Sequence, residues 1–360
     1  MTRATPSLAR NLALLLATGA CSTALAQSPA LAQGPADPAL AAKPASPATL
    51  AAQARAASTL PADDVRDAEF AKRGFIATRA DPLIRNAAGK PVFNMVAYQF
   101  VTGPAPATVH PALWREMSLL QHHGLYKVAE GVWQVRGFDI SNMTVIAGKT
   151  GWILVDPLTT RETAAAALEL VNAQLGKRPV SAVIYSHSHA DHFGGARGVV
   201  AEADSAKVEI VAPARFMEEA ASENVMAGPA MGRRAMYQFG AGLVPGAQGQ
   251  MGSGIGMATS GGDITLIAPS VTITHTGEKR VVDGVDLEFQ MVSGSEAPSE
   301  MNLYIAGPKV FLSAEMSTCS LHNGRLAVRR PSSGSSNCTG SRIRSSKSNP
   351  FGNCSAFKSD

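Results

Sequence analysis

Three of the chain's eight histidines lie within six residues, in a segment at 185–195 that reads Y-S-H-S-H-A-D-H-F-G-G. Side chains alternate at the end of a strand, so His187 and His189 lie on one side, and the following turn can bring Asp191 and His192 to a second point nearby. Imidazole and carboxylate ligands together suit zinc or another first-row divalent ion. The alternative is a polar turn that faces solvent. We predict a site for two metal ions that activate water.

The hydrophobic pattern predicts the elements that must position this motif. Strands are expected at 126–135, 143–146, 152–155, 180–185, 208–212, 264–267, 271–274, 285–292, 302–305 and 310–312, and helices at 160–175, 195–203 and 213–224. The segments 143–146 and 152–155 read as a hairpin. Strands that first pair as hairpins and then alternate with helices indicate an α/β fold with two sheets and helices outside them. Gly240 to Gly262 holds nine glycines and is expected to be a long loop.

The histidine segment resembles the H-x-H-x-D-H signature of the metallo-β-lactamase superfamily. This resemblance implies a metallo-β-lactamase-type αβ/βα four-layer sandwich, with the metal site at one edge. Asp156 matches the acid that precedes the first helix in that family, and we expect it to support the site. An aspartate that only caps the turn before Pro157 is the alternative for this position.

Five further segments narrow the resemblance to the linear alkylsulfatases. They lie at 73–77 (R-G-F-I-A), 223–234 (E-N-V-M-A-G-P-A-M-G-R-R), 245–250 (P-G-A-Q-G-Q), 295–302 (S-E-A-P-S-E-M-N) and 314–323 (A-E-M-S-T-C-S-L-H-N). The resemblance extends from about Leu60 to Asn323. It implies zinc-dependent hydrolysis of an alkyl sulfate ester, such as dodecyl sulfate, to an alcohol and sulfate. Membership of the superfamily alone does not fix the substrate.

The resemblance also implies a ligand set for two zinc ions. Glu296 joins His187 and His189 on the first zinc, and Glu315 bridges both metals. Asp191 and His192 hold the second zinc, and Asp191 and Glu315 are the predicted catalytic residues. Glu300 is the rival of Glu296, and solvated surface glutamates are the alternative for both Glu296 and Glu315.

Binding of the sulfate group calls for cations or hydrogen-bond donors. Asn224, Arg233, Arg234 and Tyr237 are the candidates in the matched segment, with charge on a helix surface and core packing as the alternative. The methionine-rich stretch from Met217 to Met257 is a candidate for holding an alkyl chain, because methionine packs adaptably. Ordinary core or loop packing is the alternative for this stretch.

The resemblance stops after Asn323. The family continues with a leucine-rich L-R-G helix, an H-H-W-P segment that supplies the last histidine of the second zinc, a dimerisation region and a sterol-carrier-like domain. No histidine follows His322, and Cys319 stands where the family has histidine. The Ser/Arg-rich tail at 324–360 is predicted to be disordered or the product of a frameshift, with a natural basic tail as the alternative. A truncated catalytic domain at 59–323 is therefore expected, with weak or no activity and a doubtful homodimer.

The N-terminal region predicts export. Residues 1–26 combine Arg3 and Arg10, a short apolar run and the small residues Ala24-Leu25-Ala26, as in a secretory signal. The apolar run is too short for a membrane span. A lipoprotein site at Cys21 is the alternative. Residues 27–58 are rich in Ala and Pro and are expected to be a flexible linker, and the mature protein is expected to be periplasmic or secreted.

Charge and cysteine content exclude other classes. The net charge is +4, but the tail at 324–360 has seven basic residues and one acidic residue, which leaves the rest of the chain negative. We therefore expect no nucleic-acid partner. Four cysteines are too few for a disulfide scaffold. Besides an alkylsulfatase, a hydrolase of a lactam, lactone or thioester and an inactive metal-binding remnant stay open.

Overall fold

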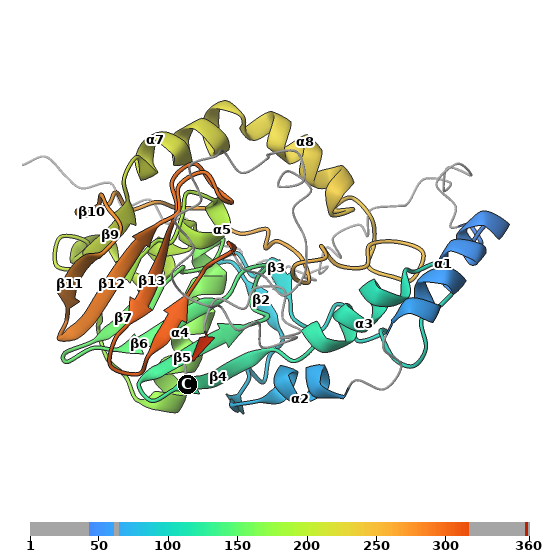
Figure 1. Cartoon of the computed structure of the whole chain (residues 1–360), viewed down its shortest axis with the longest axis horizontal. Helices are drawn as coiled ribbons and strands as arrows, with labels where there is room; N and C mark the ends of the chain where they lie inside the picture. The colour runs from blue at the N-terminus through green and yellow to red at the C-terminus, as the bar shows by residue number, and fades with distance from the viewer. Residues whose placement is uncertain (1–42, 61–64, 317–356, 359–360) are drawn as a thin grey trace, which may run out of the picture. The chain divides into compact units, whose positions relative to one another are not determined.

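The computed structural model describes residues 43–60, 65–316 and 357–358 (Figure 1). The signal segment, the first part of the linker, Cys319 and nearly all of the tail lie outside the described residues. The fold rests on two large sheets. A separate hairpin pairs β2 (Leu83–Arg85) with β3 (Pro91–Asn94).

The first sheet has eight strands in the order β1-β4-β5-β6-β7-β8-β9-β10. These strands are β1 (Phe75–Ala77), β4 (Gly124–Ala129), β5 (Val132–Arg136), β6 (Met143–Ala147), β7 (Trp152–Val155), β8 (Val180–Ile184), β9 (Glu209–Pro213) and β10 (Val271–Ile273). Pairing is antiparallel from β1 to β7 and parallel from β7 to β10. The carboxyl ends of β7 and β8 therefore lie side by side, and residues that follow these strands can meet there.

The second sheet has the order β11-β12-β13-β14-β15. These strands are β11 (Glu278–Val282), β12 (Val285–Met291), β13 (Met301–Ile305), β14 (Val310–Leu312) and β15 (Phe357–Lys358). Buried side chains of both sheets form one apolar cluster; Ile153 and Ile184 of the first sheet pack with Phe289, Leu303 and Leu312 of the second. The two sheets therefore stack face to face.

Helices cover the other face of the first sheet. Val145, Leu154 and Val183 point away from the second sheet and join a cluster with Leu170 of α4 and Trp114 of α3. The helices are α1 (Pro47–Thr59), α2 (Arg66–Lys72), α3 (Pro111–Leu120), α4 (Arg161–Leu175), α5 (Ala190–Phe193), α6 (Ala196–Val199), α7 (Phe216–Ala221) and α8 (Gly228–Gln238), with a 3-10 turn at Glu202–Asp204 and a π-helix at Ser222–Met226. The described helices include none long and apolar enough to cross a membrane.

The predicted α/β sandwich is confirmed, and the described residues form a helix layer and both sheets (Figure 1). Within the described ranges no helix covers the outer face of the second sheet. The expected loop at 240–262 contains no helix or strand.

Several local predictions are wrong. The linker contains α1, which begins with Ser46 as N-cap and Pro47 in its first turn and is rich in alanine, a strong helix former. The expected strand at 126–135 is a hairpin. The expected strand at 264–267 is irregular because Thr265 bonds the carbonyl oxygen of Gly194 through both its backbone N–H and its hydroxyl. The expected helix at 213–224 is a short α-helix followed by a π-helix.

Candidate metal centre

The metal motif begins where β8 ends. His187 and His189 stand between this strand and the short helix α5, which carries Asp191 and His192. The glycine pair after the motif lets this helix approach the loop that follows β7: a Cβ atom on Gly195 would lie 2.0 Å from the carbonyl oxygen of Pro157. Only glycine permits this close approach. The local sequence therefore fixes the motif against the ends of two neighbouring strands.

Five of the predicted ligands lie close together in the structure. One group joins His187, His192 and Glu315, another joins His189, Glu296 and Glu315, and the candidate ligand atoms of each group lie within 4.8 Å of one another. Glu315 faces both groups: its Oε1 lies 3.6 Å from Nε2 of His192, and its Oε2 lies 3.8 Å from Nε2 of His187. The predicted bridging residue is thus central.

The remaining distances place the other candidate ligands around the same point. Nδ1 of His189 lies 3.0 Å from Nε2 of His187 and 3.7 Å from Oε1 of Glu296. Oδ2 of Asp191 lies 3.3 Å from Nε2 of His192, at the more exposed edge of the cluster. The three histidines lie close together, but they do not separate clearly into one group per ion as predicted. The ring of His187 lies beside the rings of both His189 and His192.

The donor set fits metal ions. Within the described residues, Nε2 of His192 and Oε1 of Glu315 are buried and make no hydrogen bond. Unbonded buried polar atoms are costly unless a metal or another partner satisfies them. Imidazoles with carboxylates are the ligands of zinc and related first-row ions. These residues can therefore hold metal ions.

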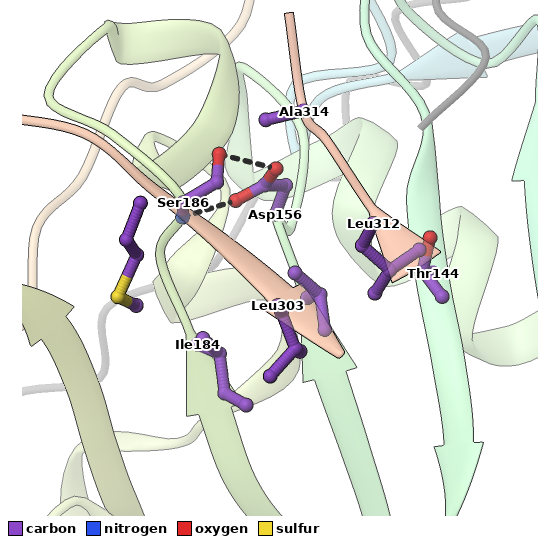
Figure 2. Close-up of a pocket in the computed structure, with 9 residues that line it drawn as sticks. Thr144, Asp156, Ile184, Ser186, Leu303, Leu312 and Ala314 are labelled. Carbon is purple, nitrogen blue, oxygen red and sulfur yellow. Dashed lines mark hydrogen bonds between the residues drawn. The ribbon is translucent and has the colours of Figure 1, made fainter. Parts of the chain in front are cut away.

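Asp156 supports the centre through Ser186 and His192, and Figure 2 shows its two hydrogen bonds with Ser186. Its carboxylate accepts hydrogen bonds from the backbone N–H of Ser186 at 2.8 Å and from the Ser186 hydroxyl at 2.7 Å, and Oδ2 lies 2.9 Å from Nδ1 of His192. The cavity beside it, between the sheets, has a volume of about 10 Å³. That is room for at most one water molecule, so this cavity cannot hold a substrate.

The two rival glutamates have different places. Glu296 faces His189, whereas Glu300 accepts hydrogen bonds from the Ser295 hydroxyl at 2.7 Å and from the backbone N–H groups of Glu296 and Ala297 at 2.8 and 3.0 Å. Burial raises the pKa of Glu300 although these hydrogen bonds oppose the shift. Glu300 therefore shapes the turn that presents Glu296.

Electrostatics at the centre reflect an excess of carboxylates around the imidazoles. Burial disfavours the charged form of His189, but the carboxylates of Glu223 and Glu315 outweigh burial and raise its pKa to about 10. For His192, Asp191 and Asp156 outweigh burial and raise the pKa well above its ordinary value. Burial opposes ionisation of Glu315, but the neighbouring imidazoles of His189 and His192 lower its pKa well below the ordinary range. The centre therefore attracts positive charge.

Residue Glu223 contacts the centre but was not among the predicted ligands. Its Oε2 lies 3.1 Å from Nε2 of His189, and the next residue, Asn224, donates from Nδ2 to the carbonyl oxygen of Ser188 at 3.3 Å and to that of Ala220 at 2.9 Å. Both residues belong to the π-helix. The only sequence signal for Glu223 was its place at the start of a segment that resembles the alkylsulfatases.

The other substrate-binding candidates lie further along the same segment. Arg233, Arg234 and Tyr237 belong to α8, which has no buried residue, and the side chain of Tyr237 is 92% exposed. Among the described residues, these three side chains make no hydrogen bond or ion pair with the metal centre. Of the four candidates, Asn224 contacts the histidine motif, through its hydrogen bond to the Ser188 carbonyl oxygen.

Backbone strain gathers around the centre. Asp156, Leu158 and Ala314 have φ values of 56°, 62° and 45°, in the left-handed region that side chains rarely adopt. Asp156 and Leu158 follow β7, and Ala314 precedes Glu315. Such strain costs of order 1–3 kcal/mol per residue and is typical of functional sites.

Comparison with known proteins identifies the class of this domain. Residues 136–286 match the family model of the metallo-β-lactamase superfamily, and the described fold agrees, so this part of the chain belongs to that superfamily. The matched range contains the histidine motif and Asp156.

Relatives that are nearly half identical to the chain in sequence are alkylsulfatases, as the sequence predicted. The chain is 48% identical over 268 residues to the linear primary-alkylsulfatase of Pseudomonas sp., covering 73% of the chain and 40% of that protein. It is 47% identical over 275 residues to the alkyl/aryl-sulfatase of Saccharomyces cerevisiae, covering 76% of the chain and 43% of that protein. The solved structure of the stereoselective inverting sec-alkylsulfatase Pisa1 from Pseudomonas sp. matches with a TM-score of 0.70 and 49% identity, over 74% of the chain and 42% of that structure. The chain thus spans about two fifths of these relatives.

Proposed function

We propose that this chain carries the catalytic domain of a metal-dependent hydrolase that cleaves linear alkyl sulfate esters to an alcohol and sulfate. The observation that carries the proposal is the convergence of His187, His189 and His192 with Glu296 and Glu315. Its support is the identity of nearly half of the aligned residues with alkylsulfatases. We further propose zinc as the metal, with two ions per site.

Residues of the chain divide the work as follows. His187, His189, His192, Asp191, Glu296 and Glu315 hold the ions, which when bound supply Lewis-acid activation of water near neutral pH. Glu315 faces all three imidazoles and would offset the positive charge of ions held there. Asp191 has a side chain that is 20% exposed, against 4% for Glu315, so it is the more accessible of these two carboxylates to a substrate.

The substrate reaches the centre from the side of Asp191 and Glu223. The cavity beside Asp156 is too small for a sulfate ester, and the side chains of Asp191 and Glu223 are each 20% exposed. The π-helix borders this side through Glu223, and α8 follows it in the chain. Val225, Met226, Met236 and Tyr237 of these two helices are exposed. We propose that they receive the alkyl chain and that Arg233 and Arg234 attract the sulfate.

An assay of the full 360-residue chain, loaded with zinc, tests this function. The wild-type chain should release sulfate from dodecyl sulfate faster than the Glu315→Ala variant does. It should not hydrolyse a chromogenic cephalosporin. Hydrolysis of the cephalosporin alone would favour the lactam-hydrolase alternative. A chain that binds at most one zinc ion and hydrolyses neither compound contradicts the proposal and favours the inactive remnant.

A further inference from the structure

Each imidazole of the metal centre has one nitrogen turned to the cluster and the other held by an outer group. Nδ1 of His187 lies 2.9 Å from the Ser186 hydroxyl, and Nδ1 of His192 lies 2.9 Å from Oδ2 of Asp156. For His189 the arrangement is reversed: Nδ1 faces the cluster, and Nε2 lies 3.1 Å from Oε2 of Glu223. Outer partners of this kind fix the tautomer and the orientation of a metal-binding imidazole.

The three outer groups come from different parts of the fold. Ser186 and Asp156 are buried residues at the ends of β8 and β7. Glu223 instead belongs to a segment we name the arm, residues 216–238, which consists of α7, the π-helix and α8. Its side chain is 20% exposed. One imidazole of the three therefore depends on a surface segment for its orientation.

We propose that Glu223 is a positioning residue that couples occupation of the metal centre to docking of the arm. Its carboxylate accepts a hydrogen bond from Nε2–H of His189 and so keeps Nδ1 as the donor toward Glu296 and Glu315. This inference rests on the proposed function, because it requires that the centre binds metal ions. Any coupling is reciprocal: an ion bound at Nδ1 strengthens the hold of His189 on Glu223, and a docked arm strengthens binding of the ion.

The arm's own packing makes this coupling effective. The arm buries Phe216 and Ala220 of α7, but neither the π-helix nor α8 has a buried residue. Contacts of Glu223 with His189 and of Asn224 with the Ser188 carbonyl are therefore prominent among those that hold the π-helix. Segments with few buried apolar contacts open at low free energy, so two polar contacts can decide whether this one is closed. π-helical turns are rare and occur frequently at functional sites.

Zinc affinity measured on the full chain tests the proposal without relying on activity. Competition with a chromogenic chelator should show about 10–100-fold weaker binding of one zinc ion to Glu223→Ala. Glu223→Gln keeps an acceptor but loses its charge, so its affinity should fall between those of Glu223→Ala and the wild type. Glu218→Ala is the matched control, because Glu218 lies on the same arm and, within the part of the chain that the structure describes, its side chain pairs with the exposed Arg215 and not with the metal centre. Its affinity should equal that of the wild type.

Hydrogen exchange adds a second measurement. Zinc should slow the exchange of backbone amides at 222–238 in the wild type and in Glu218→Ala, but not in Glu223→Ala. Unchanged affinity for both ions in Glu223→Ala overturns the inference and leaves the metal centre standing. If Glu223→Ala does not fold, unchanged affinity in Glu223→Gln overturns it equally. Absence of zinc binding in the wild type overturns the metal centre and this inference together.

Discussion

The two halves of the metal centre are built differently. The buried half, His187 and His192, has side chains that are at most 4% exposed and is supported by Ser186 and Asp156 of the core. The arm half, His189 and Glu296, includes an imidazole that is 11% exposed and is supported by the arm. Core support makes a site rigid, whereas support from a surface segment lets partners enter and leave. The buried half thus provides a fixed frame, and the arm half is the place where access and occupation are controlled.

Glu315 joins the two halves, so its loss should have the largest effect. Glu315→Ala removes the carboxylate that faces all three imidazoles, and we expect both halves to lose their ion. Hydrolysis of alkyl sulfate should fall by more than about 100-fold, because even outer partners of metal ligands cost 10–100-fold. Metal content after gel filtration measures the loss. Glu296→Ala should lose only the arm-half ion, and an unchanged content in Glu315→Ala would contradict its central place.

Asp156 supports the buried half alone, and its removal should have the next largest effect. Asp156→Ala deletes the carboxylate that accepts hydrogen bonds from Ser186 and contacts His192. The affinity for one zinc ion should therefore fall by about 10–100-fold. Loss of buried hydrogen bonds should also lower the free energy of unfolding of the metal-free protein by about 1–3 kcal/mol. Urea denaturation with and without zinc separates the two effects. If the weakened ion proves to be the one that Glu223→Ala weakens, the two halves are not independent.

Asn224 should have a smaller effect, confined to the arm half. Asn224→Ala removes the amide that donates to the Ser188 carbonyl, a neutral hydrogen bond worth about 1 kcal/mol. Binding of the arm-half ion should weaken about fivefold. Chelator competition measures this shift, and Gln238→Ala, which removes another amide of the same arm, is the control. An effect as large as that of Glu223→Ala would mean that the Ser188 carbonyl, rather than the Glu223 carboxylate, couples the arm to metal binding.

Asp283 lies outside both halves and should change stability only. It accepts hydrogen bonds from the backbone N–H groups of Thr150 and Gly151, which tie the β11–β12 turn to the β6–β7 turn. Burial raises its pKa, but hydrogen bonds from Ser181, Thr150 and Gly151 outweigh burial and lower it. Asp283→Ala should therefore cost about 1 kcal/mol at pH 7. Zinc affinity should stay unchanged.

The sign of the pH dependence follows from the lowered pKa. The contribution of Asp283 is fully present above its ordinary pKa of about 4 and is lost as pH falls through the lower folded value. Urea denaturation from pH 7 to the acid limit should show wild type and Asp283→Ala converging. Asp286→Ala, an exposed acid of the same hairpin, should run parallel to the wild type. A difference that persists in acid would assign the role to packing.

The closeness of His187 and His192 could be predicted from local sequence, but the contacts of the arm half could not, for a physical reason. The motif around His187 and His192 is local, because a strand end and a glycine pair suffice to place it. Glu296 and Glu315 are more than a hundred residues away along the chain, and only the resemblance to alkylsulfatases predicted them. The contact of Glu223 with His189 depends on a π-helical turn, and the spacing of apolar residues does not predict such a turn.

The same distinction applies to the fold. Strands with buried faces, such as β8 and β13, were predicted because apolar runs fix them. The helix α1 was not, since composition suggested a linker while Ser46, Pro47 and the alanines favour a helix. The apolar residues near Thr265 were expected to pair as a strand, but Thr265 donates its hydrogen bonds to the carbonyl oxygen of Gly194 instead. Local signals fail where a distant backbone group competes for the same hydrogen bonds.

The left-handed conformation of Ala314 has a consequence for engineering this protein. A glycine at this position would adopt the same φ without steric cost, so a screen for thermostability should favour Ala314→Gly. The same change would give the backbone before Glu315 more freedom, and the carboxylate that faces all three imidazoles would lose part of its fixed aim. Selection for heat resistance and selection for turnover should therefore pull this one residue in opposite directions.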